Sequence, residues 1–224
     1  MNDRLIPFHD RPDAGRRLAD LLSRYGGRDD VVVLALPRGG VPVGFEVAQR
    51  LAAPLDVFVV RKLGVPWQPE LAMGALASGG VLVLNPEVAG APDIDRETIG
   101  QVVERERREI DRRERSYRGD VPRPAVEGRV VILVDDGIAT GSTMRAAAQA
   151  VRELKPKRIV IATPVAPPGA RERLRTDADE FVCLAEPRSF LAIGEFYRDF
   201  AQTSDDEVRA LLARATTPEP GSIS

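Results

Sequence analysis

Two adjacent carboxylates, Asp135 and Asp136, directly follow a run of five apolar residues, Val130–Val134. The run has no helical period and is mostly β-branched, which predicts a strand buried on both faces. A short segment of small and hydroxyl-bearing residues then leads into the helix-forming stretch MRAAAQAVREL. The candidate binding residues of this segment are Gly137, Ala139, Thr140, Gly141, Ser142 and Thr143.

A strand, a small-residue loop and a helix start are the usual geometry of a phosphate site. Unpaired N–H groups of the first helical turn point at the anion, and the helix dipole favours its charge. Hydroxyl groups in the loop add further donors. The aspartates would repel a phosphate, so they suit sugar hydroxyls or a metal ion beside it. The structural alternative is a loop in which one aspartate only caps the helix.

The segment VILVDDGIATGST resembles the phosphoribosyl-diphosphate (PRPP) signature of type I phosphoribosyltransferases. The sequence lacks the spacing of a nucleotide P-loop and of a dinucleotide-binding motif. The resemblance implies that the acidic pair holds the ribose 2′- and 3′-hydroxyls and that the loop holds the 5-phosphate. It also implies a three-layer α/β/α fold with a mostly parallel sheet and an antiparallel edge strand or hairpin near Val81.

Three cations are candidates for binding a diphosphate. Arg38 lies in PRGG, which follows the apolar strand Val31–Leu36; by itself this motif could be a simple turn. Asp56–Val60 is predicted as a second inner strand that delivers Arg61 and Lys62 to its C-terminal end, where open α/β sheets bind ligands. The alternative for that pair is a solvated surface. The resemblance implies that the PRGG loop, with Gly39 and Gly40, contacts the diphosphate, and RK-x-G-x-P resembles the corresponding segment of adenine-type enzymes.

Two inserted segments follow the second predicted strand. Gly64–Gly80 is rich in glycine and proline and predicts a mobile loop running into a hairpin of Ala72–Ala77 and Val81–Leu84. The resemblance implies that this loop closes over the diphosphate. Asp95–Arg118 predicts a long helix whose Glu–Arg pairs at i,i+4 form a solvated face. Its arginines also allow a nucleic-acid surface, but the interleaved acids favour the solvated, self-paired face. Because the helix is inserted between strands of the sheet, we expect it to contribute to a lid or a dimer contact.

Aromatic residues gather in the segment 186–200. Phe190 and Tyr197 are candidates for the wall of an acceptor pocket, because a planar base stacks well on an aromatic face, and core packing is the equal alternative. Ser204, with Glu207 three residues later, predicts the start of a final helix. We expect one domain over 1–213, with a core of about 29–184, the inserted helix at 95–118, a C-terminal hood at 185–213 and a disordered tail at 214–224.

Composition narrows the functional class. The 224 residues are 43% hydrophobic and 29% charged, with a net charge of −2, which argues against a dedicated nucleic-acid surface. Cys183 is the single cysteine and His9 the single histidine, so neither a disulfide nor a histidine-based metal site can form within the chain. The sequence has no apolar run that resembles a signal peptide or a membrane span, and we expect a cytoplasmic protein.

The resulting hypothesis is an Mg²⁺-dependent transfer of the 5-phosphoribosyl group from PRPP to a nitrogenous acceptor, with release of diphosphate. Mg²⁺ would bind mainly through PRPP, and Arg38, Arg61, Lys62, Asp135 and Asp136 would carry catalysis. Ala139 occupies the position where hypoxanthine–guanine enzymes keep an aspartate, so no general base is assigned and the acceptor stays open. A homo-oligomer is expected. The alternatives are a PRPP- or nucleotide-binding regulator without turnover and a hydrolase of PRPP-like sugars.

Overall fold

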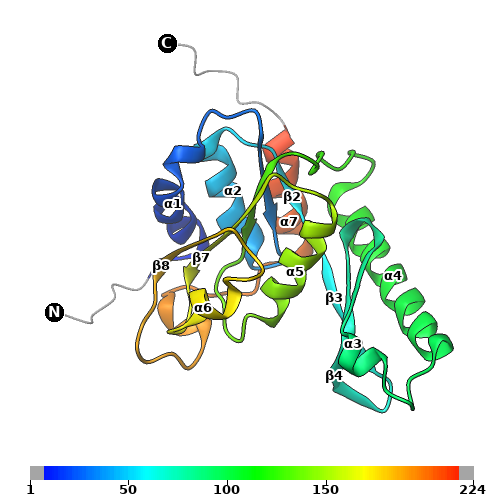
Figure 1. Ribbon diagram of the computed structural model, residues 1–224. Helices are drawn as coiled ribbons and strands as arrows, with labels where there is room; N and C mark the ends of the chain where they lie inside the picture. Colours follow the sequence, from blue (N-terminus) through cyan, green and yellow to red (C-terminus); the bar gives the residue numbers. More distant parts are fainter. Residues whose placement is uncertain (1–7, 217–224) are drawn as a thin grey trace, which may run out of the picture.

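The computed structural model describes residues 8–216, and its centre is a five-stranded parallel sheet in the order β2-β1-β6-β7-β8 (Figure 1). All neighbouring strands of this sheet run parallel, which confirms the predicted α/β class. The strands are β1 (Val31–Ala35), β2 (Leu55–Val57), β6 (Val130–Val134), β7 (Arg158–Val165) and β8 (Glu180–Ala185).

Helices cover both faces of the parallel sheet. Val31, Val33 and Ala35 of β1 pack into one apolar cluster, while Val32 and Leu34 pack into the other, as the alternation of a strand requires. Both clusters are closed by helices, so β1 and β6 are apolar at every position. The first cluster is covered by α1 (Arg11–Leu21), α2 (Gly40–Leu51) and α7 (Asp205–Thr216), and the second by α5 (Ser142–Glu153) and α6 (Ala170–Leu174).

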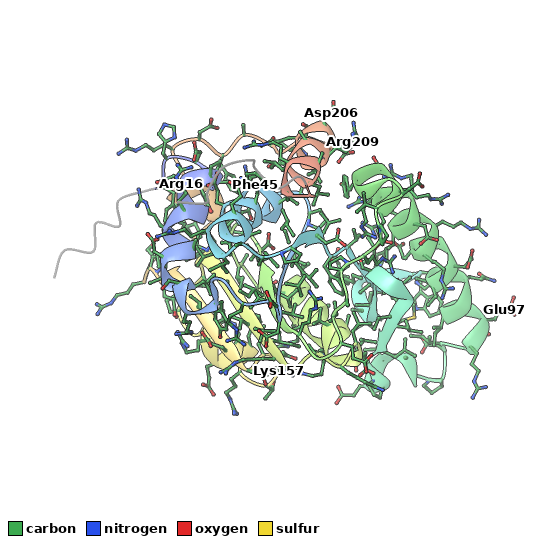
Figure 2. All side chains as sticks on the ribbon, turned by 90° about the horizontal axis from the view of Figure 1, so that it is seen from above. Arg16, Phe45, Glu97, Lys157, Asp206 and Arg209 are labelled. Carbon is green, nitrogen blue, oxygen red and sulfur yellow. The ribbon has the colours of Figure 1, made fainter. Side chains whose placement is uncertain are left out.

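An arm of separate structure projects from this body (Figure 1). It contains a three-stranded antiparallel sheet in the order β3-β4-β5, with Leu63 and Met73 packed on Val102 and Ile110 of the long helix α4. Figure 2 shows Glu97 of α4 at the opposite side of the molecule from Arg16 of α1. The arm elements are β3 (Val60–Val65), β4 (Gln68–Ala77), β5 (Val81–Leu84), α3 (Pro86–Ala89) and α4 (Arg96–Arg118).

Two predictions for residues 56–80 differ from the structure of the arm. The predicted strand Asp56–Val60 is divided, because β2 ends at Val57 and the chain then leaves the parallel sheet for β3. The predicted loop from Gly64 is instead the end of β3 and most of β4, and only the turn at 66–67 separates the two strands. The predicted hairpin of β4 and β5 is confirmed, with Gly79 at a φ of 84° in its turn.

Helix α4 begins where the sequence predicts, with the Asp95 side chain accepting a hydrogen bond from the Thr98 N–H. The three expected i,i+4 pairs are present: Glu104–Arg108, Glu109–Arg113 and Glu114–Arg118. The expectation that its charges form only a solvated face is wrong for two acids. Glu106 and Glu114 are each 6% exposed, and both are paired with arginines.

The final helix, α7, begins at the residue that the sequence predicts. The Ser204 hydroxyl accepts a hydrogen bond from the Glu207 N–H at 3.1 Å and so caps α7. The sequence predicts a tail from residue 214, but α7 continues to Thr216; residues 217–224 lie outside the described part. Within residues 8–216, no helix combines the length and the apolar character that a membrane span needs.

Candidate functional site

The loop between β6 and α5 presents hydroxyl groups at a helix start. Thr140, Ser142 and Thr143 are at least partly exposed, and the first helical hydrogen bond is donated by the Arg145 N–H to the Gly141 carbonyl at 2.8 Å. The N–H groups before Arg145 therefore have no partner further back in α5. Gly141 has a φ of 84°, a conformation that glycine adopts at little cost. The structure thus places exposed hydroxyls at the start of α5, in the segment 137–143 that is called the phosphate loop below.

The two aspartates at the end of β6 lie in different surroundings. Asp135 is partly exposed, and its Oδ1 accepts a hydrogen bond from the Asp136 N–H at 2.9 Å. Asp136 is 8% exposed. Burial, together with the neighbouring Asp136 carboxylate, raises the pKa of Asp135 well above its ordinary value. Burial also raises the pKa of Asp136, although its hydrogen bond with Arg11 and the charge of that arginine oppose the rise.

The loop between β1 and α2 lies directly against this acidic pair. A Cβ atom on Gly39 would lie 2.7 Å from the Asp136 Cγ, and one on Gly40 would lie 2.7 Å from the Val134 carbonyl oxygen. Both glycines are needed because any side chain would force the two loops apart. The structure therefore brings the predicted residues Gly39 and Gly40 together with Asp135 and Asp136.

Each of the three predicted cations lies beside an acidic side chain. The Arg38 guanidinium lies 3.6 Å from the Asp205 carboxylate at the start of α7. Arg61 pairs with Glu106 at 2.8 Å, and the Lys62 amino group donates to the Glu70 carbonyl at 2.6 Å. The expectation that Arg61 and Lys62 stand at the C-terminal end of a parallel strand is wrong, because the chain has already entered the antiparallel arm.

Arg11 is a site residue that the sequence did not indicate. Its Nε donates to the Asp136 Oδ2 at 2.7 Å, and both side chains are 11% exposed. Its Nη1 donates to the Ala201 carbonyl at 2.6 Å, and its guanidinium lies 4.0 Å from the centre of the Phe200 ring. Arg11 and Asp136 are 125 positions apart in the sequence, so no local pattern relates them.

Tyr197 is engaged in packing. Its ring centre lies 5.3 Å from that of Phe8 and 5.0 Å from that of Phe200, and its hydroxyl donates to the Asp136 carbonyl at 2.5 Å. Burial, and the nearby Asp136 carboxylate, raise the pKa of this phenol. Of the two interpretations left open for the aromatic segment, the structure supports packing for Tyr197. Phe190 is partly exposed and stacks on Phe196 with 5.4 Å between ring centres.

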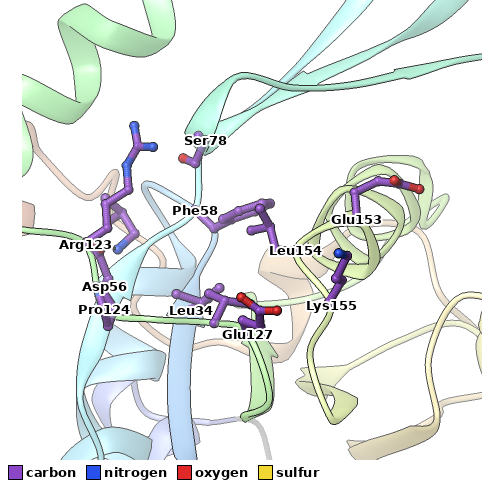
Figure 3. Close-up of a pocket in the computed structure, with 13 residues that line it drawn as sticks. Leu34, Asp56, Phe58, Ser78, Arg123, Pro124, Glu127, Glu153, Leu154 and Lys155 are labelled. Carbon is purple, nitrogen blue, oxygen red and sulfur yellow. Dashed lines mark hydrogen bonds between the residues drawn. The ribbon is translucent and has the colours of Figure 1, made fainter.

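A cavity of about 390 Å³ lies at the other end of α5 (Figure 3). Phe58, Ser78, Arg123 and Leu154 are among its lining residues, and none of the predicted site residues borders it. Leu154 directly follows the last residue of α5, whereas the phosphate loop lies at its first turn. A helix of 12 residues is about 18 Å long, so this cavity is separate from the candidate site.

No group of three or more histidine, cysteine, aspartate or glutamate side chains within residues 8–216 could hold a metal ion. Asp135 and Asp136 thus form at most a two-carboxylate set. Since Arg11 already binds Asp136, the two aspartates are not assigned as ligands of a protein-held metal ion.

Comparison with known proteins agrees with this geometry. The family model described as "Phosphoribosyl transferase domain" matches residues 8–200. The Mycobacterium tuberculosis protein Rv0571c, whose name assigns it provisionally as a phosphoribosyl transferase, is 51% identical over 208 residues, covering 93% of this chain and 47% of that protein. The chain therefore spans about half the length of this curated relative.

Two further comparisons cover most of the chain. The crystal structure of TT1426 from Thermus thermophilus matches with a TM-score of 0.84 and 44% identity, covering 95% of this chain and 100% of that one. The "Bifunctional protein PyrR" of Streptomyces coelicolor is 28% identical over 161 residues, covering 70% of this chain and 65% of that protein. With the family model spanning the sheet, the arm and the aromatic segment, this chain belongs to the phosphoribosyl transferase domain family.

Proposed function

We propose that the protein transfers the 5-phosphoribosyl group from PRPP to a nitrogenous acceptor and releases diphosphate. The observation that carries this proposal is the β6–α5 loop. Exposed hydroxyls stand there at the start of a 12-residue helix, shortly after Asp135, a residue that is partly exposed. An anion site beside a sugar-binding carboxylate fits a phosphorylated ribose.

The 5-phosphate is assigned to the first turn of α5. The hydroxyls of Thr140, Ser142 and Thr143 and the free N–H groups before Arg145 are its donors. The Ser142 N–H is only weakly occupied, by the Thr140 hydroxyl at 3.4 Å. A phosphate oxygen would replace that long contact with a charge-assisted hydrogen bond.

The diphosphate is assigned to the start of α2, with Gly39 and Gly40 in the loop and Arg38 beside them. The Arg38 side chain is 36% exposed, and its contact with Asp205 is long enough to exchange for a diphosphate oxygen. Arg61 and Lys62 are held by acids of the same arm. Their part in binding diphosphate requires these pairs to open.

The reaction breaks the bond from ribose C1 to the diphosphate oxygen and forms one from C1 to the acceptor nitrogen. Diphosphate leaves with the bonding electrons, and the acceptor proton passes to solvent or to the departing diphosphate, since Ala139 supplies no base. Mg²⁺ bound to PRPP would neutralise the leaving group. The chain's own residues hold the ribose and the two phosphate groups in place. Phe190, partly exposed, is the candidate contact for a planar acceptor.

We further propose a cytoplasmic homo-oligomer. The unpaired Cys183, packed against the apolar core with its pKa raised by burial to about 12, suits a reducing compartment. The exposed charged face of α4, with Glu104 and Arg108 on it, is the surface assigned to a second copy.

Calorimetry with PRPP and Mg²⁺, followed by a panel of nucleobases assayed for released diphosphate, tests the proposal. Binding of PRPP with turnover of one base supports the enzyme, and absence of PRPP binding contradicts it. Binding without turnover on any base instead supports a PRPP-binding regulator. The Arg61–Glu106 and Lys62–Glu70 pairs favour that second candidate, because they withhold two cations from the ligand.

Thr143→Ala is expected to weaken PRPP binding about 5- to 10-fold, because one exposed donor of the phosphate loop is lost. The melting temperature should not change, since the side chain is exposed. Calorimetry and thermal unfolding measure the two effects. Thr98→Ala, in the first turn of α4, is the matched control and should leave PRPP affinity unchanged. Equal affinities for both variants would contradict the assignment of the 5-phosphate.

A further inference from the structure

Protein groups enclose Asp136. Its Oδ2 accepts from the Arg11 Nε at 2.7 Å, its carbonyl accepts from the Tyr197 hydroxyl at 2.5 Å, and its N–H donates to the Asp135 Oδ1 at 2.9 Å. Gly39 lies so close to the carboxylate that even a methyl group there would collide with it. With 8% of the residue exposed, Asp136 has little surface left for a ligand.

Arg11 connects three segments that lie far apart in the sequence. It stands at the start of α1, binds Asp136 after β6, and reaches the segment after β8 through the Ala201 carbonyl and the face of Phe200. A second close contact joins two of these segments, the phosphate loop and residues 186–203, because a Cβ atom on Gly137 would lie 2.9 Å from the Ile193 Cγ1. The Arg11–Asp136 pair is thus the polar centre of a joint between α1, the phosphate loop and residues 186–203.

Asp135 has a different environment. The residue as a whole is partly exposed, and its side chain accepts one hydrogen bond within the loop, from the Asp136 N–H. It also borders the glycines at the start of α2, since a Cβ atom on Gly40 would lie 3.2 Å from its Oδ1. Asp135 therefore lies between the two loops assigned to the 5-phosphate and the diphosphate, where the ribose must sit.

We infer that the two aspartates have divided roles, and this inference rests on the proposed function. Asp135 is the carboxylate that receives the ribose hydroxyls. Asp136, neutralised by Arg11, is a positioning residue that fixes α1 and residues 186–203 to the phosphate loop. The pair that looks uniform in sequence then contributes one ribose ligand and one structural joint.

The physical test separates charge from shape. Arg11→Gln alone leaves a buried carboxylate without its cation, which is strongly destabilising. Arg11→Gln combined with Asp136→Asn replaces the ion pair by two neutral groups that can still form a hydrogen bond. If Asp136 only positions the loop, this neutral pair preserves the site; if its charge holds the ribose, the neutral pair destroys it.

Calorimetry with Mg²⁺ and PRPP measures the affinity of each variant, and thermal unfolding measures its melting temperature. Asp135→Asn should lower PRPP affinity at least about 30-fold, the effect of a lost charge-assisted hydrogen bond. The neutral pair should change affinity by less than about threefold. Arg11→Gln should lower the melting temperature by roughly 10 °C, and the added Asp136→Asn should restore most of that loss.

The pH dependence of PRPP binding is a further measurement. A pair that only stabilised the fold would not change the pH midpoint of the affinity. Burial and then the Asp136 carboxylate raise the pKa of Asp135, Arg11 lowers it, and the Tyr197 phenol is the other titratable group that interacts with Asp135. PRPP affinity should fall as pH decreases through the pKa of Asp135. This midpoint should move to higher pH in Arg11→Gln, and to lower pH in the neutral pair. PRPP itself also titrates, but this contribution is the same for all variants and does not affect the difference between their midpoints.

A matched control is the second buried arginine–aspartate pair, Arg118–Asp56, at 3.0 Å with side chains 10% and 7% exposed. Neutralising it as Arg118→Gln with Asp56→Asn should leave PRPP affinity and its pH midpoint unchanged. Loss of affinity in the Arg11/Asp136 neutral pair equal to that of Asp135→Asn would overturn the divided roles. An unchanged melting temperature in Arg11→Gln would contradict the structural role of the Arg11–Asp136 pair. If the wild-type protein does not bind PRPP, the ribose assignment falls with the proposed function, while the melting temperatures still decide the joint.

Discussion

Gly39→Ala is expected to remove PRPP binding and to lower the free energy of unfolding by about 2–4 kcal/mol. Gly39 has a φ of −60°, so alanine meets no backbone strain there. The new methyl group would instead lie 2.7 Å from the Asp136 Cγ. That carboxylate cannot move away freely, because Arg11 holds it in a nearly buried ion pair. The β1–α2 loop must therefore shift, and with it the start of α2.

Calorimetry measures the loss of PRPP affinity, and urea unfolding measures the loss of stability. The control is Gly100→Ala in α4, where a Cβ atom would have no neighbour within 4 Å. Removing a glycine from a helix there should stabilise the protein by roughly 0.5–1 kcal/mol. If the two variants bind PRPP equally well, the contact between the two loops has no role in the site.

Arg118→Gln is expected to lower the free energy of unfolding by about 3–5 kcal/mol, because it leaves the buried Asp56 carboxylate without a cation. The Arg118 Nε binds Asp56 at 3.0 Å and its Nη2 lies 3.5 Å from Glu114. These two acids are 5% and 6% exposed. The Arg118–Asp56 pair joins the last turn of α4 to β2, while Glu114 keeps a second partner in Arg123. The variant should therefore also loosen the arm, which limited proteolysis would detect.

The destabilisation should increase with pH. Burial raises the pKa of Asp56, and the charge of Arg118 opposes that rise. Without Arg118 the folded-state pKa moves further above the unfolded one, so stability falls as pH increases between these two values. Urea unfolding at pH 5 and pH 8 would show the larger difference from wild type at pH 8. Arg107→Gln, an exposed position of the same helix, should stay within about 0.5 kcal/mol at either pH.

The parallel sheet is predictable from the sequence because its strands carry their own signal. The runs around Val33 and Ile132 are apolar at every position, and only a strand covered on both faces needs that pattern. The charged pairs of α4 are equally predictable, since residues four apart on a helix are neighbours. Both signals depend on residues close together in the chain.

The features that the sequence does not predict depend on distant contacts. The break after Val57 has no local marker, because Phe58 and Val59 continue the apolar run; the chain turns where the arm offers Leu63 and Leu76 a separate core. The different environments of Asp135 and Asp136 follow from Arg11, which is not close to either in sequence. A motif predicts the type of site, and only the packing of α1 distinguishes its two acids.

The arm lies entirely within the connection from β2 to β6, two strands that each pair with β1. Bringing β6 beside β1 therefore requires closing a long loop, and the entropy of that closure grows only with the logarithm of loop length. Doubling or halving the connection changes this cost by only about 0.6 kcal/mol. A change in the length of the turn between β3 and β4 is consequently cheap for the parallel sheet, whereas Ala77 and Tyr117, which pack in its two apolar clusters, fix the arm to the body.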